Sequence, residues 1–399
     1  MRLGRPGLIS DYATDTAIFR SNVARFWFLV LLVATVVLGL GGSIPLGFMT
    51  LSLDGEATFY LITTLFAAIA AIGLNLVTGV AGQVSLGHAF FLGVGGFTAA
   101  VLGGLGETRR VFDLASGDFV EQVLLFGFEL DMLIWLPAAG LMAALAGLIV
   151  APVAFRLRGL YLAVVTLGLV FLGEHLFREW DVVSGGVGVG RPTPPLSLLG
   201  FRFDQPSEVL GMTLDRQKKL FLLGFVLLLI FGLAAKNLMR SKIGRALSAI
   251  RDRDLAASMM GIDLSRYKTV AFVISSFFAG VAGALIYTVI GRILPESFNL
   301  LLSVEYIAMI LIGGVATVSG AVMGAAFITF LPLIVRTMAG FPLFGFISTS
   351  PGGGFPTVAH IEEILFGLLI VVFLIFEPLG LYGIWIRIRN YWKAWPFSY

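Results

Sequence analysis

The sequence lacks cysteine and carries few charged residues. Without cysteine, the chain cannot form disulfide bonds, use a thiol as a nucleophile or bind a metal through thiolates. Only 13% of its 399 residues are charged, whereas 58% are hydrophobic. Soluble domains average about 25% charged residues, so this composition excludes an ordinary soluble domain and indicates a membrane protein in contact with the lipid bilayer.

The sequence also lacks a nucleotide-binding loop, a metal-ligand motif and a basic patch. No Gly-x-x-x-x-Gly-Lys-Ser/Thr motif occurs, and the glycine-rich stretch at 186–191 is not followed by Lys-Ser or Lys-Thr. The histidines, His88, His175 and His360, have no His-Glu-x-x-His spacing, which argues against a metal-dependent hydrolase. The net charge is only +3, and the basic residues lie at the edges of apolar stretches, so no nucleic acid partner is expected.

Long hydrophobic stretches are abundant. A bilayer core about 30 Å thick requires roughly 20 apolar helical residues. About ten stretches approach this length, at 26–41, 58–78, 84–105, 132–154, 159–177, 220–235, 269–290, 304–317, 320–337 and 361–377. We therefore predict an all-α, polytopic membrane protein whose transmembrane domain covers residues 26–377, with glycine-rich breaks and about ten transmembrane helices.

The basic residues predict the orientation of the chain. With ten spans both termini lie on one side, and assigning them to the cytoplasm places most of the 27 Lys and Arg residues inside. Residues 1–25 and 378–399 are then cytoplasmic. A long extracytoplasmic loop is predicted at 178–219 and a cytoplasmic loop at 236–268. Lys218 and Lys219, at the outer end of the sixth stretch, are exceptions to the rule.

The predicted inner loop contains an amphipathic segment. Its apolar residues recur at helical spacing and are Ile243, Ala246, Leu247 and Ile250. After a break, Asp252 is expected to cap a second, short helix, Asp254 to favour the positive start of that helix, and Gly261 to end it. This short helix could rest on the membrane surface or dock into a protein groove. The acidic residues fit a protein partner better than an anionic lipid surface.

Polar residues interrupt the apolar sequence at the second and third stretches. The stretch GQVSLGHAF at 82–90 follows Asn75 and includes Gln83, Ser85 and His88. Buried polar side chains either hold helices together or line a translocation path, and the sequence leaves both alternatives open. Glu305 raises the same question, although it lies close enough to one end of its stretch to reach the membrane interface.

The predicted outer loop begins with residues that could gate a path. Glu174 approaches the outer end of a span, and Ser184, Gly185 and Gly186 open a stretch rich in glycine and proline. For Glu174, simple anchoring at the membrane surface is the alternative to a role in an outer gate.

Four stretches together resemble a known family of permeases. The segment DLAASMMGI at 254–262 resembles the cytoplasmic signature of ABC importer permeases. Three others resemble LivM-type permeases of branched-chain amino acid importers more closely: GLNLVTGVAGQVSLGHAFFLGVGGFTAA at 73–100, LRGLYLAVVTLGLVFLGEHL at 157–176 and LLSVEYIAMILIGGVATVSGAVMGAA at 301–326. The chain is identified as a member of that family on these four stretches, and the resemblance implies an ABC importer permease fold.

The resemblance implies a transport subunit that is not itself an enzyme and binds no cofactor. Two separate ATP-binding cassette subunits would use ATP and Mg, a homologous LivH-type permease would complete the pore, and an extracytoplasmic solute-binding protein would deliver the substrate. The residues expected to couple the permease to the ATPase are Asp252, Asp254, Ala256, Ala257 and Gly261. No role is assigned to the segments at 107–131 and 338–360.

The substrate and the energy source have alternatives. The resemblance suggests branched-chain amino acids, but related importers carry urea, short amides, other amino acids or aromatic acids. A proton-coupled secondary transporter is the alternative class, with Glu174, His88 and Glu305 as relay groups. Such a carrier has no need of a short inner docking helix.

Overall fold

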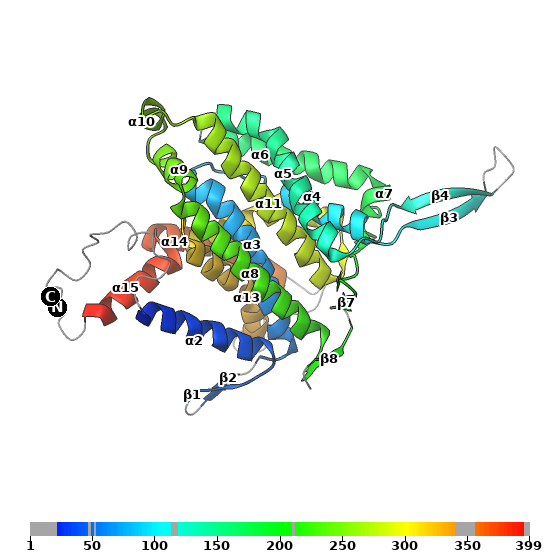
Figure 1. The fold of residues 1–399 in the computed structure, drawn as a ribbon, viewed down its shortest axis with the longest axis horizontal. Coiled ribbons are helices and arrows are strands. Elements are labelled where there is room, and N and C mark those ends of the chain that lie inside the picture. The colour runs from blue at the N-terminus through cyan, green and yellow to red at the C-terminus, as the bar shows by residue number, and fades with distance from the viewer. Residues whose placement is uncertain are drawn as a thin grey trace.

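The computed structural model describes residues 22–46, 49–51, 53–112, 119–157, 159–203, 205–209, 212–339 and 356–394. The predicted segment 1–25 therefore lies outside the described residues up to position 21, as do most of the segment 338–360 and the end of the tail at 395–399. The described residues form a bundle of helices with short strand pairs around its edges (Figure 1). This confirms the all-α prediction.

The helices follow one another along nearly the whole described chain. They are α2 (Asn22–Gly39), α3 (Gly55–Asn75), the π-helix η1 (Leu76–Val80), α4 (His88–Gly103), α5 (Met132–Arg156), α6 (Leu160–Glu179), α7 (Asp181–Ser184), α8 (Arg216–Arg240), α9 (Lys242–Asp252), α10 (Asp254–Met259), α11 (Leu264–Ile290), the 3-10 helix η2 (Pro295–Ser297), α12 (Leu300–Gly313), α13 (Val318–Ala339), α14 (Val358–Phe376) and α15 (Gly380–Ala394).

Six of the described helices are long and apolar enough to cross a membrane. They are Gly55–Val80, Met132–Val153, Leu160–Glu179, Arg216–Arg240, Leu264–Ile290 and Val318–Ala339. A seventh span is formed if α14 and α15, which meet at a bend of 46°, count as one. Shorter apolar helices cover Arg25–Gly39, His88–Gly103 and Leu300–Gly313. Each of the ten predicted stretches thus overlaps a helix, but by length alone only six or seven are full spans.

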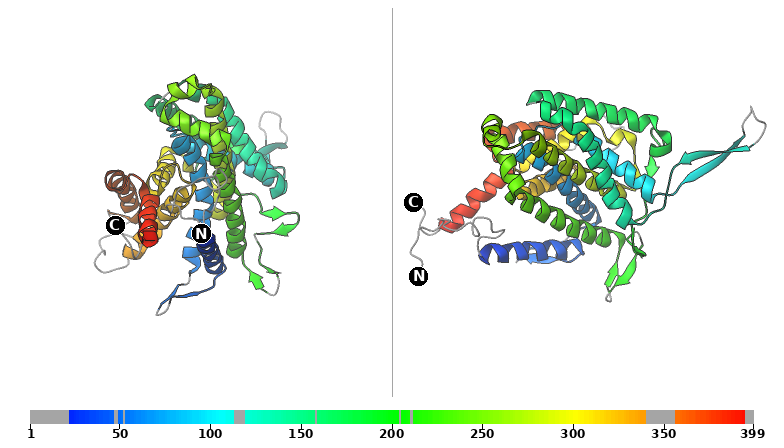
Figure 2. Two further views of the ribbon diagram at one scale, coloured as in Figure 1. Left: turned by 60° about the vertical axis from the view of Figure 1, so that its left-hand side comes forward. Right: turned by 45° about the horizontal axis from the view of Figure 1, so that its top comes forward.

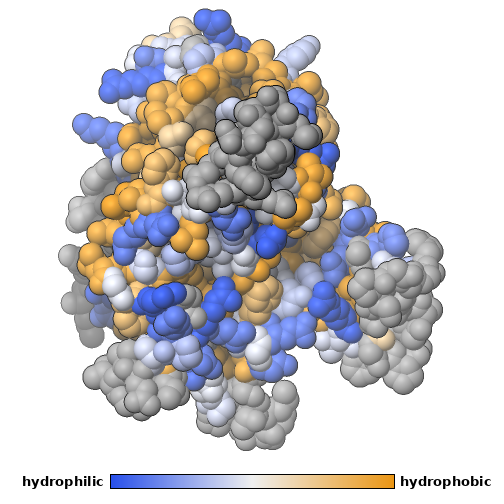
Figure 3. All heavy atoms as spheres, turned by 90° about the vertical axis from the view of Figure 1, so that its right-hand side faces the viewer, coloured by the Kyte–Doolittle hydropathy of each residue, from blue (hydrophilic) through white to orange (hydrophobic). Residues whose placement is uncertain are grey.

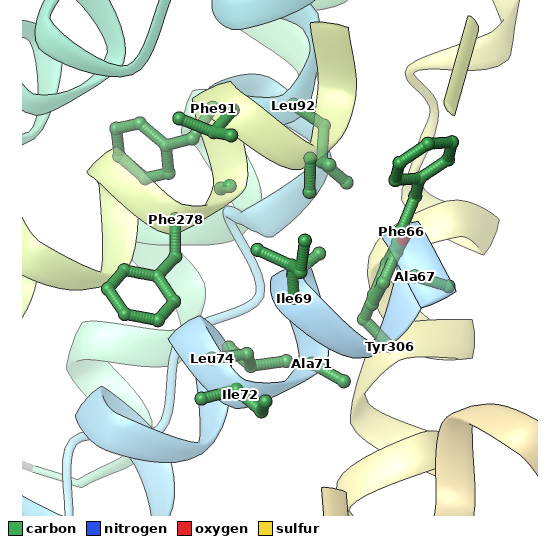
Figure 4. Close-up of a cluster of buried hydrophobic side chains, with 14 of the residues drawn as sticks. Phe66, Ala67, Ile69, Ala71, Ile72, Leu74, Phe91, Leu92, Phe278 and Tyr306 are labelled. Carbon is green, nitrogen blue, oxygen red and sulfur yellow. The ribbon is translucent and has the colours of Figure 1, made fainter. Parts of the chain in front are cut away.

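The centre of the bundle is built around α3 and α11. Helix α11 packs against α3, α4 and α5, and α3 also contacts α8 and α13. In the apolar stretch of α3, 83% of the residues are buried, against 22% in that of α8, so α3 is central and α8 peripheral. Figure 4 shows side chains of α3, including Phe66, Ile69 and Leu74, beside Phe91 of α4 and Phe278 of α11.

Glycines allow the central helices to approach closely. A Cβ atom on Gly95 of α4 would collide with the backbone of Gly280 in α11, and one on Gly324 of α13 would collide with the carbonyl of Met309 in α12. Small residues at helix crossings are typical of membrane bundles because they allow extensive van der Waals contact. In the same way, a Cβ atom on Gly313 would collide with the carbonyl of Gly320 in α13.

The short strands form five two-stranded pairs in the described residues. They are β1 (Ile44–Leu46) with β2 (Met49–Leu51), β3 (Glu107–Phe112) with β4 (Phe119–Leu125), β5 (Arg191–Pro192) with β10 (Arg292–Ile293), β6 (Ser197–Leu198) with β7 (Phe201–Arg202), and β8 (Ser207–Val209) with β9 (Met212–Leu214). The β3 and β4 pair is the unassigned segment 107–131, and it projects away from the bundle (Figure 1). Figure 2 shows the same projection from a second side.

The two ends of the bundle differ in their secondary structure. In Figure 1, α9, α10 and α15 lie at one end, and the β3 and β4 hairpin lies at the opposite end. We call these the inner and the outer end, after the orientation predicted from the sequence. Figure 3 looks onto the outer end, where hydrophilic residues gather and hydrophobic residues surround them. The predicted loops at 178–219 and 236–268 lie at opposite ends and include the first or last turns of α6, α8 and α11.

Candidate functional site

The connection between α3 and α4 is an unwound segment in which buried and exposed residues alternate. Helix α3 continues as the π-helix η1, residues 81–87 are not helical, and α4 begins at His88. Gly82 has a φ of +68°, and a Cβ there would lie 2.7 Å from Cγ of Arg251, so both the backbone and the contact favour glycine. Irregular backbone at membrane depth requires cover by protein or by a water-filled cavity. The predicted glycine-rich break is therefore confirmed here.

Asn75 fastens the end of α3 to the turn between α12 and α13. Its Nδ2 donates a hydrogen bond of 2.8 Å to the carbonyl of Thr317, and its Oδ1 accepts one of 2.8 Å from the amide of Ala316. Both ends of this buried amide are satisfied by backbone groups. This geometry supports the helix-packing alternative for Asn75.

The start of α4 is held by hydroxyl groups from two other helices. The amide of Leu86 donates to Oγ1 of Thr166 in α6 at 2.9 Å, and the amide of Ala89 donates to Oγ of Ser303 in α12 at 3.0 Å. Ser85 is buried, and its Oγ accepts from the amide of Gly87 at 3.3 Å. Thr166 and Ser303 are not predicted from the sequence, because their only signal is a hydroxyl within an apolar stretch. These contacts support a packing role for Ser85.

Gln83 and His88 differ from Asn75 because Gln83 lacks partners for both atoms of its amide and His88 lacks one for Nε2, although the His88 ring also has a hydrogen bond to the backbone of Ala70. Gln83 is 5% exposed, and neither atom of its amide has a hydrogen-bond partner among the described residues. His88 is 2% exposed, lies edge-on to the ring of Tyr306 at 5.2 Å, and has no such partner for Nε2. An unsatisfied buried polar group costs about 1–3 kcal/mol. These two residues therefore fit the path-lining alternative better than the packing one.

The amphipathic segment of the inner loop forms α9. Ser241 caps this helix by accepting from the amide of Ile243 at 3.1 Å. The predicted apolar stripe is confirmed, because Ala246, Leu247 and Ile250 are all buried against the bundle. Helix α9 is thus fixed by burial of one face.

The cap predicted for the second short helix is wrong. Asp252 is the last residue of α9, and its Oδ1 lies 3.5 Å from Nε of Arg251. The helix ends there because the next residue, Arg253, has an extended backbone. Arg253 precedes α10 without a side-chain hydrogen bond to it. Asp254 is in the first turn of α10 as expected. Gly261, with φ +81°, lies just beyond its end and is followed by a hydrogen bond from Ile262 to the carbonyl of Ala257.

At the inner end of the bundle, α10 and the residue after it expose apolar side chains on the molecular surface. Leu255 is 66% exposed, Met259 88% and Met260 83%, whereas Ala257 is buried. Ala256 is exposed on the same short helix. Large exposed apolar side chains on a protruding element are typical of a surface that docks into another protein.

Arg251 joins the inner loop to the unwound segment. Its Nη1 donates a hydrogen bond of 2.9 Å to the carbonyl of Gly79 in η1. The same side chain occupies the space beside Gly82. Arg251 is not predicted as a functional residue, because nothing in the local sequence indicates a partner 172 residues away.

The outer-end residues form local contacts. Glu174 pairs with Arg178 on α6 at 2.6 Å, which supports surface anchoring. Ser184 is buried and accepts from the amide of Gly186 at 3.3 Å, and Gly185 and Gly186 both have positive φ. The loop that they open is held at Gly188, whose amide donates to Oε1 of Glu296 at 2.8 Å.

Two buried cations of the predicted outer loop, residues 178–219, bond to backbone carbonyl groups. Arg191 donates a hydrogen bond of 3.2 Å to the carbonyl of Val183 and another to the carbonyl of Phe126. Burial lowers the pKa of Arg191 to about 10, opposed by the charge of Glu107, so the guanidinium remains cationic at neutral pH. Lys219, an exception to the charge rule, is buried and donates to the carbonyl of Arg202 at 2.8 Å. The position of the Lys219 ammonium group is thus set by backbone carbonyl groups of the predicted outer loop.

The residues of a proton relay are not brought together. Glu305 lies in the second turn of α12, partly buried, and interacts electrostatically with Glu362 of α14. Among the described residues, no hydrogen bond or ion pair joins Glu174, His88 and Glu305. The described residues contain no group of three or more His, Asp or Glu side chains that could hold a metal ion.

The chain is similar to permease proteins of known description. The family profile described as "Branched-chain amino acid transport system / permease component" matches residues 57–374. The high-affinity branched-chain amino acid transport system permease protein LivM of Escherichia coli is 32% identical over 276 residues, which are 66% of this chain and 59% of LivM. The match therefore leaves about two fifths of that relative uncovered.

Two further relatives extend the comparison. The high-affinity branched-chain amino acid transport system permease protein BraD of Pseudomonas aeruginosa is 25% identical over 79% of this chain and 91% of BraD. A probable branched-chain amino acid transport permease protein, LivH of Methanocaldococcus jannaschii, is 25% identical over 41% of this chain and 48% of its own length. No solved structure matches the chain.

Proposed function

Because this multi-pass membrane chain belongs to the family of branched-chain amino acid transport system permease components, we propose that it is the permease subunit of an ATP-driven importer for branched-chain amino acids. The observation that carries this proposal is the family match over residues 57–374, which includes the unwound segment and the inner loop. In this proposal the subunit spans a plasma membrane, both ends of the chain lie in the cytoplasm, and α10 faces the ATPase.

The importer needs partners because this chain has no P-loop of its own. Two ATP-binding cassette subunits bind ATP and Mg, a second permease of the LivH type completes the translocation path, and an extracytoplasmic solute-binding protein delivers the amino acid to the outer end. The similarity to a LivH permease supports a pairing of related subunits.

The coupling to the ATPase runs through α10 and Arg251. The exposed Leu255, Met259 and Met260 dock into a groove of the cassette subunit, and Asp252, Asp254 and Ala256 surround them. Movement of the docked helix passes to the unwound segment through the hydrogen bond from Arg251 to Gly79. Gly261 allows the chain to leave α10 in a left-handed turn.

Within the bundle, Gln83 and His88 line the path, whereas Asn75 and Ser85 hold its walls in place. Glu305 faces the path from the outer half of α12. At the outer end, Ser184, Gly185 and Gly186 form a gate whose glycines allow the loop to move. The ion pair of Glu174 with Arg178 gives Glu174 a surface role beside this gate.

Reconstitution tests the proposal. The full-length chain in liposomes should take up no leucine when driven by a proton or solute gradient, and should do so with ATP once the second permease, the cassette subunits and the binding protein are added. Vigorous uptake by the chain alone would favour a proton-coupled carrier and contradict the proposal. Urea, a short amide and an aromatic acid in the same assay distinguish the alternative substrates, and preference for any of these over leucine would overturn the assignment.

A further inference from the structure

The last described helix, α15, carries an apolar stripe that continues beyond its contacts with the bundle. Leu381, Ile384, Trp385 and Ile388 recur at i, i+3, i+4 and i+7, so they share one face of the helix. Leu381 and Ile384 are half-buried, whereas Trp385 is 51% exposed and Ile388 48%. Helix α15 contacts α12 and α13, and its far end leaves the bundle at the inner end (Figures 1 and 2). The protein therefore covers the start of this stripe and leaves the rest open.

Basic side chains flank the open part of the stripe. Successive residues of an α-helix are about 100° apart, which places Arg387 on one flank of the stripe and Arg389 on the other. Both side chains are exposed. Arg387 is bonded to Glu377, whereas no ion pair between described residues includes Arg389. Such side chains can lie along an apolar membrane region while their charged ends reach the lipid headgroups.

The charge of α15 is complementary to an anionic surface. Residues 378–399 contain no Asp or Glu, and their basic residues are Arg387, Arg389 and Lys393. Helix α10, the other protruding element of the inner end, begins instead with the acidic Asp254. A negatively charged membrane surface attracts the first helix and repels the start of the second. The two elements therefore suit different partners.

The position of these residues in the sequence places them at the membrane interface. Residues 364–386 include a single charged residue, Glu377, and the cluster of basic residues begins directly after them. An apolar stretch followed by basic residues is typical of the inner edge of a membrane span. Trp385 is exposed, and so is Tyr391 at 60%. Trp and Tyr side chains are enriched at the level of the headgroups, so the open half of α15 belongs at that level.

The bend before α15 attaches it to the centre of the bundle. Helices α14 and α15 meet at 46°, and the amide of Gly380 donates to the carbonyl of Glu377 at 2.7 Å. Gly380 has a φ of +63°, and a Cβ there would lie 2.5 Å from the carbonyl oxygen of Ile312 at the end of α12. The bend thus packs against the connection between α12 and α13, which is also the connection that Asn75 holds.

We propose that α15 binds the headgroups of anionic phospholipids at the inner end of the molecule. Arg389 meets the lipid phosphate, and the exposed Trp385 and Ile388 enter the outermost part of the acyl region. This inference goes beyond the proposed function, because it depends neither on the transported solute nor on the cassette subunits. Lipid that binds this face of the folded protein stabilises the folded state.

Labels on opposite faces of α15 test the contact with lipid. Because the chain has no cysteine, Ile388→Cys and Asn390→Cys each give one site for a nitroxide label. The labelled full-length chain is placed in nanodiscs of phosphatidylcholine and phosphatidylglycerol. The label at 388, on the stripe, should meet oxygen dissolved in the lipid more often than a water-soluble nickel complex. The label at 390, on the opposite face, should show the reverse.

Two results of the labelling experiment would contradict the proposal. Equal accessibility of both labels to the nickel complex would show that α15 lies in water. A label at 388 that neither reagent reaches would show that another protein surface covers the stripe.

Thermal unfolding tests the preference for anionic lipid. The unfolding temperature of the full-length chain should rise as phosphatidylglycerol replaces phosphatidylcholine in the nanodiscs. In Arg389→Gln, about fivefold more phosphatidylglycerol should be needed for half of this rise, the change expected for the loss of one basic residue near a membrane surface. Arg389→Lys keeps the charge and should behave like the unmodified chain. Arg266→Gln is the matched control, since Arg266 is also exposed but lies in the first turn of α11.

The control separates a site on α15 from a general attraction of the inner end to anionic lipid. Arg266→Gln should leave the lipid dependence unchanged. An equal weakening in Arg266→Gln and Arg389→Gln, no weakening in Arg389→Gln, or no rise with phosphatidylglycerol in the unmodified chain would each overturn the inference. None of these measurements uses leucine, ATP or a partner subunit, so uptake by the assembled importer tests the proposed function separately.

Discussion

The outer and inner ends of the bundle are fastened in different ways. At the outer end, β5 pairs with β10, Glu296 accepts from Gly188, and Arg292 donates to the carbonyl of Val189. At the inner end, α9 is held by burial of its apolar stripe and by the hydrogen bond from Arg251 to Gly79. The outer contacts are therefore hydrogen bonds between extended segments, whereas the inner contacts are mainly buried apolar surface. We expect substitutions at the two ends to have different effects.

Substitution of Gly82 should have the largest effect. Gly82→Ala places a Cβ against Arg251 at a residue with positive φ, and the two effects together should lower the free energy of unfolding by about 3 kcal/mol. Gly200→Ala is the matched control, because Gly200 also has a positive φ but has open space around it. Its cost should be about 1 kcal/mol. Thermal unfolding of both proteins measures the difference, and equal losses would mean that the Arg251 contact is unimportant.

The side-chain amides of Asn75 and Gln83 lie on either side of η1. Substitution of Asn75 should lower the stability of the protein, whereas substitution of Gln83 should not. Asn75→Leu leaves the amide of Ala316 and the carbonyl of Thr317 without their partner and should destabilise the protein by about 2 kcal/mol. Gln83→Leu removes an unsatisfied amide and should leave stability unchanged or raise it, while leucine uptake falls. Thermal unfolding and uptake per folded protein separate these results. A loss of stability in Gln83→Leu as large as that in Asn75→Leu would assign Gln83 to packing.

The docking surface on α10 is expected to contribute less than these core contacts. Met259→Asp should weaken binding of the cassette subunit by about tenfold, as loss of a moderate interface contact does, without changing the thermal stability of the permease. Leu199→Asp, at an equally exposed apolar residue of the outer end, should leave that binding unchanged. Affinity is measured with the purified cassette subunit, and an identical loss in both variants would remove α10 as the docking element.

A small effect on stability is expected from Arg251 and Arg292, which are two of the arginines that bridge distant segments. Arg251→Gln and Arg292→Gln each remove a hydrogen bond to a backbone carbonyl and should cost about 1 kcal/mol. Only Arg251→Gln should raise the ATP hydrolysed per leucine transported, because only that bond joins the inner loop to the unwound segment. A similar rise in Arg292→Gln would show that coupling does not depend on the inner end in particular.

The sequence predicts the elements whose pattern is local. The apolar stretches, the stripe on α9 and the turn at Gly261 each follow from periodicity or from a glycine, and the structure contains all of them. The prediction that Asp252 caps the second short helix is wrong, because Asp252 is still part of α9. Helix boundaries of this kind vary by one or two residues and depend on tertiary contacts.

The difference between Asn75 and Gln83 could not be predicted. Both are amides in the same polar stretch, but Asn75 meets backbone groups 241 and 242 residues away, and Gln83 meets none among the described residues. The same applies to Arg251 and to the hydroxyls of Thr166 and Ser303, whose partners are set by how the helices cross. A single sequence carries no signal for such distant pairs.

The start of α4 also has a consequence for synthesis of the chain. The amide of Ala89 depends on Ser303, which is made 214 residues later, so α4 enters the bilayer long before its partner exists. An unpaired amide in hydrocarbon is costly, and during this interval water or the insertion machinery has to satisfy it. Ribosome-bound chains that end before residue 303 should therefore remain close to the insertase, and release should follow once α12 has emerged.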